Sequence, residues 1–403
     1  MKCHCMKSFA CFVSLLLFYL NLLFAQTNFT LRIDPENGRG GTASQVFDSI
    51  EFIPLETTSE SLFGSIDQME VTDDYFFILD TRSKSILVFN RNGRLHTRIR
   101  SGGNDKYFGY FTLDRVDKRI IIHNRFSNGL LVYDFDGKLM SKEPFPDGTK
   151  SLYYFGKNKV LYNLSRPFDA NAMPKNSCDL AYSDGFSSIR KYLNPYNPKF
   201  ENGEYNIEYN PFNFSGEKGS CMFSLPFDYK AYQLNDTGLL RTYKFIFPMQ
   251  YSLPANFTTD SSYKGHRAQY VYSDRENAKK INAVSNVYKM GDYLLFAAPT
   301  GQLKIGSDWN YLYNLKSGNL ISFSRVTGDN SSYYFPVLAS LLEKVDAVYE
   351  GDIYSSFASF RVFAIKNNVD KLVNYPPSIQ KLLATGTKND NPVIVKARLK
   401  PNL

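Results

Sequence analysis

A repeated pattern of short strands and turns constrains the fold more than any other feature of this 403-residue chain. Residues 73–95 read DDYFFILDTRSKSILVFNRNGRL, and residues 116–139 read VDKRIIIHNRFSNGLLVYDFDGKL. The two copies align at one constant offset, at which Gly93 matches Gly137. An offset of about 40–45 residues is the length expected of one four-stranded blade of a β-propeller.

The composition of each copy predicts strands. In the first copy, the runs YFFILD and SILVFN are rich in aromatic and β-branched residues and are too short for helices. Gly93 and Gly137 stand where a tight hairpin needs a positive φ, so a further strand can return antiparallel. Because one such sheet cannot bury both of its faces alone, it must stack on neighbouring copies.

Strands at the two ends of the chain have no repeat of their own. Residues 46–56 read VFDSIEFIPLE, and residues 391–399 read NPVIVKARL. Propellers close by pairing a strand from one terminus into the blade formed by the other, because this removes two open sheet edges. We therefore expect both segments in one blade, and two independent edge strands are the alternative.

Weaker copies between these ends complete an all-β fold, which we predict to be a six-bladed β-propeller of four-stranded antiparallel blades. The later blades are expected at residues 152–193, 214–247 and 284–326, and from residue 345 onward. The phrase SIQKLLATG, preceded by Pro376 and Pro377, predicts one short helix before the closing strand.

The first 25 residues have the composition of an export signal. Lys2 and Lys7 precede the apolar run CFVSLLLFYLNLLFA, which is shorter than the ~20 apolar residues of a spanning helix and ends at Ala25. We expect cleavage there, with an uncleaved anchor as the alternative. A single propeller domain then covers residues 26–403, in the periplasm or secreted, as a monomer without a transmembrane segment.

The cysteine positions leave one question open. Cys3, Cys5 and Cys11 belong to the leader, and Cys11 precedes the apolar core, where a lipid-bearing cysteine is not expected. Cys178 and Cys221 remain after cleavage. In an oxidising compartment they form either one disulfide or two buried free thiols.

Several phrases resemble a known family. The stretches IPLETTSESLFGSIDQMEVTDDYFFILD, ILVFNRNGRL and DNPVIVKARLK are similar to six-bladed β-propellers that Bacteroides-type bacteria export, relatives of the NHL-repeat propellers. The resemblance covers nearly the whole chain after the leader and is strongest over residues 53–139. It implies the propeller fold and export, and it carries no settled activity. In place of the family's GxGPGEY-like turn, residues 101–107 read SGGNDKY and lack the Pro-Gly-Glu.

The sequence contains no signature of catalysis or of metal or cofactor binding. Apart from His4 in the leader, the histidines are His96, His123 and His266, and none has the spacing of metal ligands. There is no G-x-S-x-G elbow, phosphate-binding loop or C-x-x-C pair. We therefore assign no catalytic residue, metal or cofactor. A modest net charge of +8 indicates solubility rather than nucleic-acid binding.

Strand order predicts one binding face. If the strands of each blade run outward from the axis, the connections between second and third strands and those between blades share one face. Long inserts at residues 194–212, 249–281 and 300–309 fall on it. Because functional residues concentrate on loops held by a rigid scaffold, this loop face is the candidate binding surface. The candidate ligand-binding residues are Arg82, Lys106, Tyr107, Arg125, Arg166 and Tyr196. Ordinary solvated side chains are the alternative.

Two classes of function fit these observations. In the first, aromatic rings and guanidinium groups on the loop face bind a glycan, a peptide or a partner protein. In the second, the protein is a periplasmic lyase or hydrolase acting on an acidic saccharide, which requires carboxylates such as Asp105 or Asp308 to converge at the axis. The first is favoured because no acid/base constellation is visible in the sequence.

Overall fold

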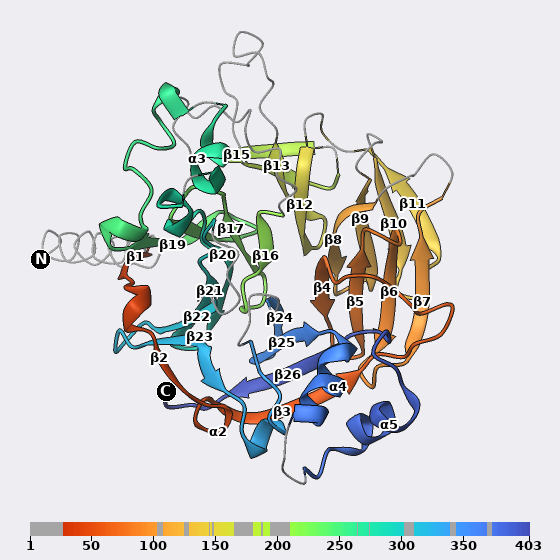
Figure 1. Cartoon of the computed structure of the whole chain (residues 1–403). Coiled ribbons are helices and arrows are strands. Elements are labelled where there is room, and N and C mark those ends of the chain that lie inside the picture. Colours follow the sequence, from red (N-terminus) through yellow and green to blue (C-terminus); the bar gives the residue numbers. More distant parts are fainter. Residues whose placement is uncertain are drawn as a thin grey trace, which may run out of the picture.

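Six antiparallel sheets surround a common axis in the computed structural model (Figure 1). One strand of each sheet lies nearest the axis, namely β4, β8, β12, β16, β20 and β24. The predicted all-β fold, a six-bladed β-propeller of four-stranded antiparallel blades, is therefore confirmed. The structure describes residues 27–102, 108–124, 129–144, 146, 149–164, 180–186, 188–193, 210–263, 265–273, 275–301, 310–338, 344–368 and 373–403.

The blades are numbered along the chain, and their strands are given from the axis outward. Blade 1 contains β4 (Gln68–Val71), β5 (Tyr75–Asp80), β6 (Ser85–Asn90) and β7 (Leu95–Arg100), and blade 2 contains β8 (Phe108–Asp114), β9 (Arg119–Asn124), β10 (Leu130–Asp134) and β11 (Leu139–Glu143). Blade 3 contains β12 (Thr149–Gly156), β13 (Lys159–Leu164), β14 (Leu180–Asp184) and β15 (Ser188–Leu193), and blade 4 contains β16 (Phe212–Phe214), β17 (Ser220–Ser224), β18 (Lys230–Asn235) and β19 (Leu239–Ile246). Blade 5 contains β20 (Ser285–Met290), β21 (Tyr293–Ala297), β22 (Asn310–Asn314) and β23 (Leu320–Thr327), and blade 6 contains β24 (Val345–Tyr349), β25 (Asp352–Phe357), β26 (Val393–Leu399) and β3 (Phe47–Pro54). The predicted blades agree with these bounds within a few residues.

The glycines of the repeat occupy the conformation that the hairpins require. Gly93 and Gly137 both have a φ of +84°, a value that other residues rarely adopt. A Cβ atom on Gly93 would also lie 2.3 Å from the carbonyl oxygen of Pro54 in blade 6. This turn therefore needs glycine both for its backbone conformation and for close packing between the first and last blades.

Both chain ends contribute to blade 6, as predicted. β26 pairs with β25 on one side and with β3 on the other, so a C-terminal strand is enclosed between two others. In this register Val395 lies opposite Phe52. The alternative of two independent edge strands is wrong.

Two further strands on the outside of the ring were not predicted. β1 (Thr27–Arg32) pairs parallel with β19, and β2 (Arg39–Thr42) pairs parallel with β23 (Figure 1). Each adds a fifth strand that covers an outer sheet edge. Leu31 and Ile33 are buried in the cluster shared by blades 4 and 5, so this N-terminal segment is part of the core.

The apolar core lies between the facing sides of adjacent blades. Between blades 1 and 2, Phe77 and Leu79 pack with Ile122 and Phe135. The ring centroids of Phe77 and Phe135 are 4.6 Å apart. Burial of one such side chain contributes roughly 1.5–3 kcal/mol. Each blade therefore depends on its two neighbours.

Helices are few and lie in the connections. The α-helices are α2 (Ala43–Val46), α3 (Arg267–Ser273), α4 (Ser359–Asn368) and α5 (Pro377–Thr385), and the 3-10 turns are η1 (Pro35–Asn37), η4 (Met249–Tyr251), η5 (Ser261–Tyr263), η6 (Asn277–Lys279) and η7 (Asn330–Ser332). α5 confirms the helix predicted after Pro376 and Pro377. Over the described ranges, no helix is long and apolar enough to cross a membrane.

Cys221 is a buried free thiol. Burial raises the pKa of this thiol well above its usual value. Of the two alternatives left by the sequence, the structure therefore supports a free thiol at this position. Cys178 lies outside the described residues.

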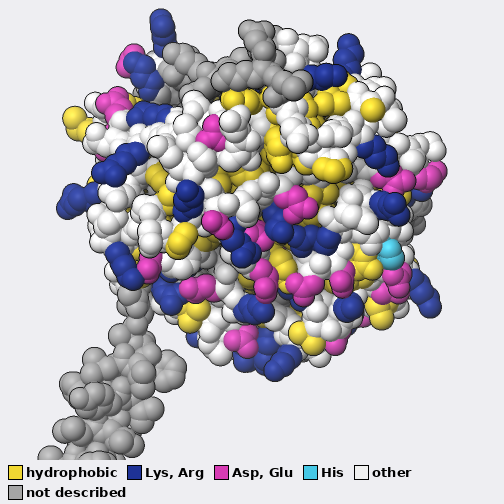
Figure 2. All heavy atoms as spheres, turned by 90° about the horizontal axis from the view of Figure 1, so that it is seen from below, with side chains coloured by type: hydrophobic (Ala, Val, Ile, Leu, Met, Phe, Trp, Pro, Cys, Tyr) yellow, Lys and Arg dark blue, Asp and Glu magenta, His cyan; other side chains and the backbone are white. Residues whose placement is uncertain are grey.

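Charged side chains of both signs cover the side of the ring seen in Figure 2. Lys and Arg alternate there with Asp and Glu, and neither sign gathers into a separate region. Such mixing is the usual arrangement of a soluble surface.

Candidate functional site

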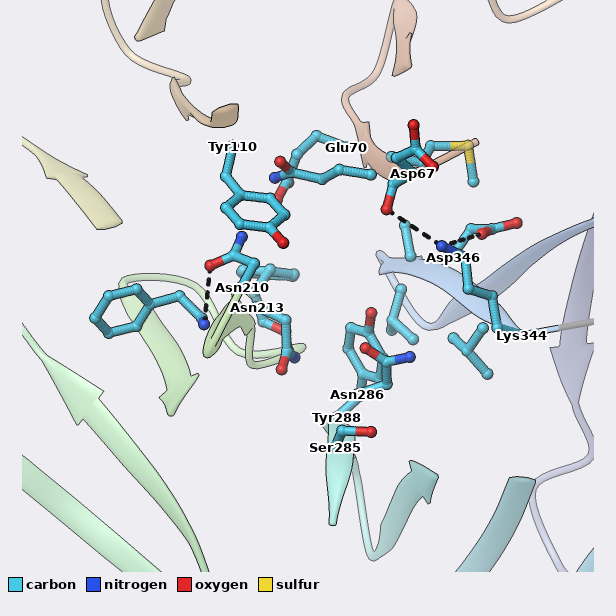
Figure 3. A pocket seen from close by; sticks show the side chains of 17 residues that line it. Asp67, Glu70, Tyr110, Asn210, Asn213, Ser285, Asn286, Tyr288, Lys344 and Asp346 are labelled. Carbon is cyan, nitrogen blue, oxygen red and sulfur yellow. Dashed lines mark hydrogen bonds and ion pairs between the residues drawn. The ribbon is translucent and has the colours of Figure 1, made fainter. Parts of the chain in front are cut away.

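A cavity of about 250 Å³ lies on the axis, between the innermost strands (Figure 3). Blades 1, 2, 4, 5 and 6 all contribute side chains to its wall. The polar lining residues are Asp67, Gln68, Glu70, Tyr110, Asn210, Asn213, Ser285, Asn286, Tyr288, Lys344 and Asp346. The cavity is thus a polar chamber within an otherwise apolar ring.

Three of these residues stand at β-bulges of innermost strands. Tyr110 lies where the register of β8 shifts against β9, Asn286 where β20 shifts against β21, and Asp346 where β24 shifts against β25. A bulge inserts an extra residue and re-aims its side chain, and bulges are common beside active sites. The same device therefore brings a polar side chain to the axis from three different blades.

Amide side chains of the preceding blade support two of the bulges. Gln68 in blade 1 donates to the carbonyl of Phe111 at 2.7 Å and accepts from its N–H at 3.0 Å. Asn213 in blade 4 donates to the carbonyl of Val287 at 2.7 Å. These contacts satisfy backbone groups next to the irregular positions, so the bulges are stabilised parts of the fold.

Asn286 has a strained backbone and an amide available for binding. Its φ of +48° is in the left-handed region, which is uncommon for a residue other than glycine. Its side chain is half-buried and forms no hydrogen bond within the described part of the chain. Backbone strain of this kind often accompanies a functional position.

Asp346 is the second polar group with unused hydrogen-bonding capacity. Its side chain is only 1% exposed, and Ser356 donates a hydrogen bond of 2.7 Å to Oδ2. Among the described residues, Oδ1 has no hydrogen-bond donor, and the Nζ of Lys344 is 3.8 Å away. Burial raises the pKa of Asp346 to about 6, although Lys344 and Ser356 act in the opposite direction. The pKa of this carboxyl group therefore lies closer to neutral pH than that of an ordinary Asp.

A second cavity of about 440 Å³ adjoins the axial one. Four residues line both cavities, namely Ser285, Asn286, Lys344 and Asp346. The remaining wall comes from the loop-face ends of blades 1, 5 and 6, including Pro299 and Phe360. We refer to the two cavities together as the axial site.

Arg115 occupies the opposite end of the axis from the loop face. It lies in the turn between β8 and β9 and forms an ion pair of 2.8 Å with Glu70. Its guanidinium group lies over the rings of Phe214 and Tyr349, at 5.5 and 5.3 Å. Arg115 therefore links blades 1, 2, 4 and 6 across this end of the axis, and the lining of the second cavity extends the axial site towards the loop face.

The carboxylates of the axial cavity differ in their surroundings. Asp67 accepts hydrogen bonds from the backbone and hydroxyl of Thr81, at 2.7 and 2.6 Å. Burial raises the pKa of Glu70, and the ion pair with Arg115 only partly offsets this. Only Asp346 combines deep burial with an unused oxygen. Over the described residues, no group of His, Cys, Asp and Glu side chains could hold a metal ion.

The residues predicted for ligand binding are mostly outside the described residues. Arg82 is exposed in the β5–β6 loop and does not line the axial site. Lys106, Tyr107, Arg125, Arg166 and Tyr196, and also Asp105 and Asp308, lie in parts of the chain that the structure does not describe. Their roles stay predictions.

Asn286 and Asp346 were not predicted from the sequence. A repeated pattern could have indicated them, because VSNVY at residues 284–288 and VDAVY at residues 345–349 have the same form. In both, a polar residue interrupts an apolar strand, and the two strands are the innermost ones of consecutive blades. A polar residue there must face either a partner or the axis.

A larger groove of about 1060 Å³ lies outside the ring, between β3, α5 and the β6–β7 turn. Its main polar groups already have partners. Arg91 donates to the carbonyl of Thr72 and to the hydroxyl of Tyr354, and Glu56 accepts from the N–H of Leu95. The Nε of Arg91, however, is buried without a hydrogen-bond partner among the described residues, so this groove also has one unused donor in its wall.

The fold and the site define a β-propeller with a polar axial cavity. The chain belongs to the family described as a domain of unknown function (DUF4934), whose model matches residues 29–398. No curated protein matches the chain.

Solved structures share the fold at low sequence identity. A protein from Bacteroides fragilis that is described as exported aligns with a TM-score of 0.70 and 14% identity, over 93% of this chain and 100% of that one. A member of the DUF4221 family from Bacteroides vulgatus aligns with a TM-score of 0.50 and 13% identity, over 88% and 97%. A streptogramin B lyase aligns with a TM-score of only 0.42 and 12% identity, over 89% and 99%. The first two likenesses support the propeller fold and say nothing of activity. The relation to NHL repeats stays a prediction.

Proposed function

We propose that this protein is an exported binding module that takes a saccharide in the axial site. The observation that carries the proposal is the unused hydrogen-bonding capacity of Asn286 and Asp346 at the wall of a polar cavity. Sugar hydroxyls both donate and accept, so they can bond an amide and a carboxylate side by side. A chamber of this size suits a few sugar units better than a folded partner.

Export is supported by the composition of the leader, residues 1–25. A periplasmic or secreted location also agrees with the exported structural neighbour. N-terminal sequencing of protein from the extracellular or periplasmic fraction should read from near Gln26. Recovery of Met1 from that fraction would contradict cleavage.

We further propose that three arginines of the loop face bind the outer part of a longer ligand. They are Arg82, Arg125 and Arg166. Each follows the second strand of a blade in the sequence, after β5, β9 and β13. Guanidinium groups suit bidentate contacts with anionic groups of a longer ligand. The triple change to Ala should alter the free energy of unfolding by no more than about 1 kcal/mol, yet abolish binding of that ligand. Calorimetric titration and urea unfolding measure the two effects.

The proposal is tested by a thermal-shift screen of the mature protein against saccharides, followed by calorimetric titration of each hit. A ligand that binds only the folded state raises the melting temperature. Asn286→Ala and Asp346→Asn should each weaken binding roughly tenfold or more, since each removes a buried polar contact. Asn28→Ala, an exposed amide on β1, is the control. Equal losses in the control, or no binding by any saccharide, would refute the proposal.

The enzyme alternative retains one specific observation. The pKa of Asp346, about 6, suits a general acid or base at neutral pH. Asp67 and Glu70 supply further carboxylates to the same cavity. If the protein is a lyase or hydrolase of an acidic saccharide, Asp346→Asn should abolish turnover while substrate still binds. Product analysis of acidic oligosaccharides by mass spectrometry distinguishes this result from simple binding.

A further inference from the structure

The two cavities of the axial site differ in charge. The deeper one is lined by the carboxyl groups of Asp67, Glu70 and Asp346 against one ammonium group, that of Lys344. Among the described residues, the one nearer the loop face is lined by the cationic side chains of Lys344 and Arg361 and by the carboxyl group of Asp346. Arg361 has a further interaction of its own, and its guanidinium group has five N–H donors. A ligand that matched both would place hydroxyl donors inward and an anionic group towards the loop face.

Lys344 lies at the boundary between the cavities and retains donors for a ligand. Its side chain is 47% exposed. The ammonium group donates one hydrogen bond of 3.2 Å, to the carbonyl of Asp67, and Figure 3 shows it between Asp67 and Asp346. An ammonium group has three N–H donors, so it can also bond an anionic group placed in the second cavity.

Phe360 supplies an aromatic surface beside these cations. It stands in the first turn of α4, lines the second cavity and is 50% exposed. An aromatic ring in a cavity wall offers a flat apolar surface on which a ligand can pack. The apolar face of a sugar ring can cover it. Arg361, the next residue of α4, then lies within the same wall as the ring.

From this arrangement we infer that the ligand is an acidic saccharide, with a uronic acid unit over Phe360, its carboxylate at Arg361 and Lys344, and its hydroxyl groups directed towards Asp346. This inference rests on the proposed saccharide binding and specifies its chemical class. The carboxylate and a guanidinium group match in geometry as well as in charge. A neutral sugar of the same shape would lack that contact.

The test compares the methyl glycosides of glucuronic and galacturonic acid with those of glucose and galactose, by calorimetric titration of the mature protein. We expect the better uronide to bind at least about tenfold more tightly than its neutral counterpart. Arg361→Gln should reduce this ratio to near one while the neutral glycoside binds as before. Lys366→Gln removes the same charge from the exposed last turn of α4 and should leave the ratio unchanged. Phe360→Ala should weaken both members of the pair alike.

Two further readouts keep the outcomes separate. Arg361→Lys should retain part of the preference, and an unchanged melting temperature of Arg361→Gln shows that the fold is intact. Equal affinity for uronides and neutral glycosides, or equal effects of Arg361→Gln and Lys366→Gln, would overturn the acidic class and leave saccharide binding standing. If none of the four glycosides binds while another saccharide of the screen does, the inference alone fails; if no saccharide binds, the proposed function fails with it.

Discussion

At the scale of single residues, Asp346 is held in a position that opposes its own ionisation. Its pKa is raised to about 6 in the folded protein, whereas that of an unfolded Asp is about 3.9. Between these values the folded state binds more protons than the unfolded state, so stability falls as the pH rises from about 4 to 6. Above pH 6 the full cost remains, and it amounts to about 2–3 kcal/mol.

Replacing this carboxyl group should therefore stabilise the protein. Asp346→Asn keeps the shape and removes the charge, so we expect it to be about 2 kcal/mol more stable than the parent at pH 8 and nearly equal at pH 4. Urea unfolding at both pH values measures this difference. A variant less stable than the parent at pH 8 would mean that the ionised carboxylate has a compensating partner.

Arg115 and Glu70 make the opposite case, in which a half-buried charge has its partner; their side chains are 30% and 15% exposed. Removing one member of a fully buried pair costs about 3 kcal/mol or more, so a smaller loss, about 2 kcal/mol, is expected here. We predict that loss for Arg115→Met, and a smaller one for the double variant with Glu70→Gln. A double-mutant cycle in urea gives the coupling energy. Equal stabilities of the single and double variants would show that the two side chains are not coupled.

Prediction from the sequence reached the correct fold but did not include Asn286 and Asp346 among the candidate site residues. Asn286 and Asp346 act through β-bulges, and a bulge changes register by one residue without altering the alternation of polar and apolar side chains enough to be recognised. The shared V-x-x-V-Y phrase marks the strands. Which side chain reaches the axis depends on how the innermost strand pairs with the second strand of its blade. This register is known only from the structure.

At the scale of elements, β26 explains how the ring is closed. It lies between β25 and β3, and Val393, Ile394 and Val395 are buried. Deleting residues 391–403 should therefore prevent cooperative folding, whereas deleting residues 401–403 alone should lower the melting temperature only slightly. Differential scanning calorimetry compares the two truncations. A cooperative transition at the parent temperature after the longer deletion would contradict closure by β26.

The sequence predicted β3 and β26 and missed β1 and β2, although in β1 Phe29 and Leu31 also alternate with polar residues. β3 and β26 were recognised because VFDSIEFIPLE and NPVIVKARL follow a strand pattern. β2, with the sequence RGGT, contains two glycines and no apolar side chain. It forms because the outer edge of β23 offers it parallel pairing, which no local pattern announces.

At the scale of the whole molecule, the ring surrounds a polar cavity whose walls come from five of its six blades. Strand pairing and blade stacking explain the ring. Among the polar groups at its centre, Gln68, Asn213 and the Glu70–Arg115 pair support the fold, whereas burial of Asp346 opposes it. The proposed binding would explain why a destabilising carboxyl group lies at the axis.

The most direct test of this account is a crystal structure of the mature protein with a bound saccharide from the screen. We predict density for the ligand in the axial site, in contact with Asn286 and Asp346 and next to Phe360. Density only in the groove beside α5, or a ligand bound while the axial site holds solvent alone, would contradict the account.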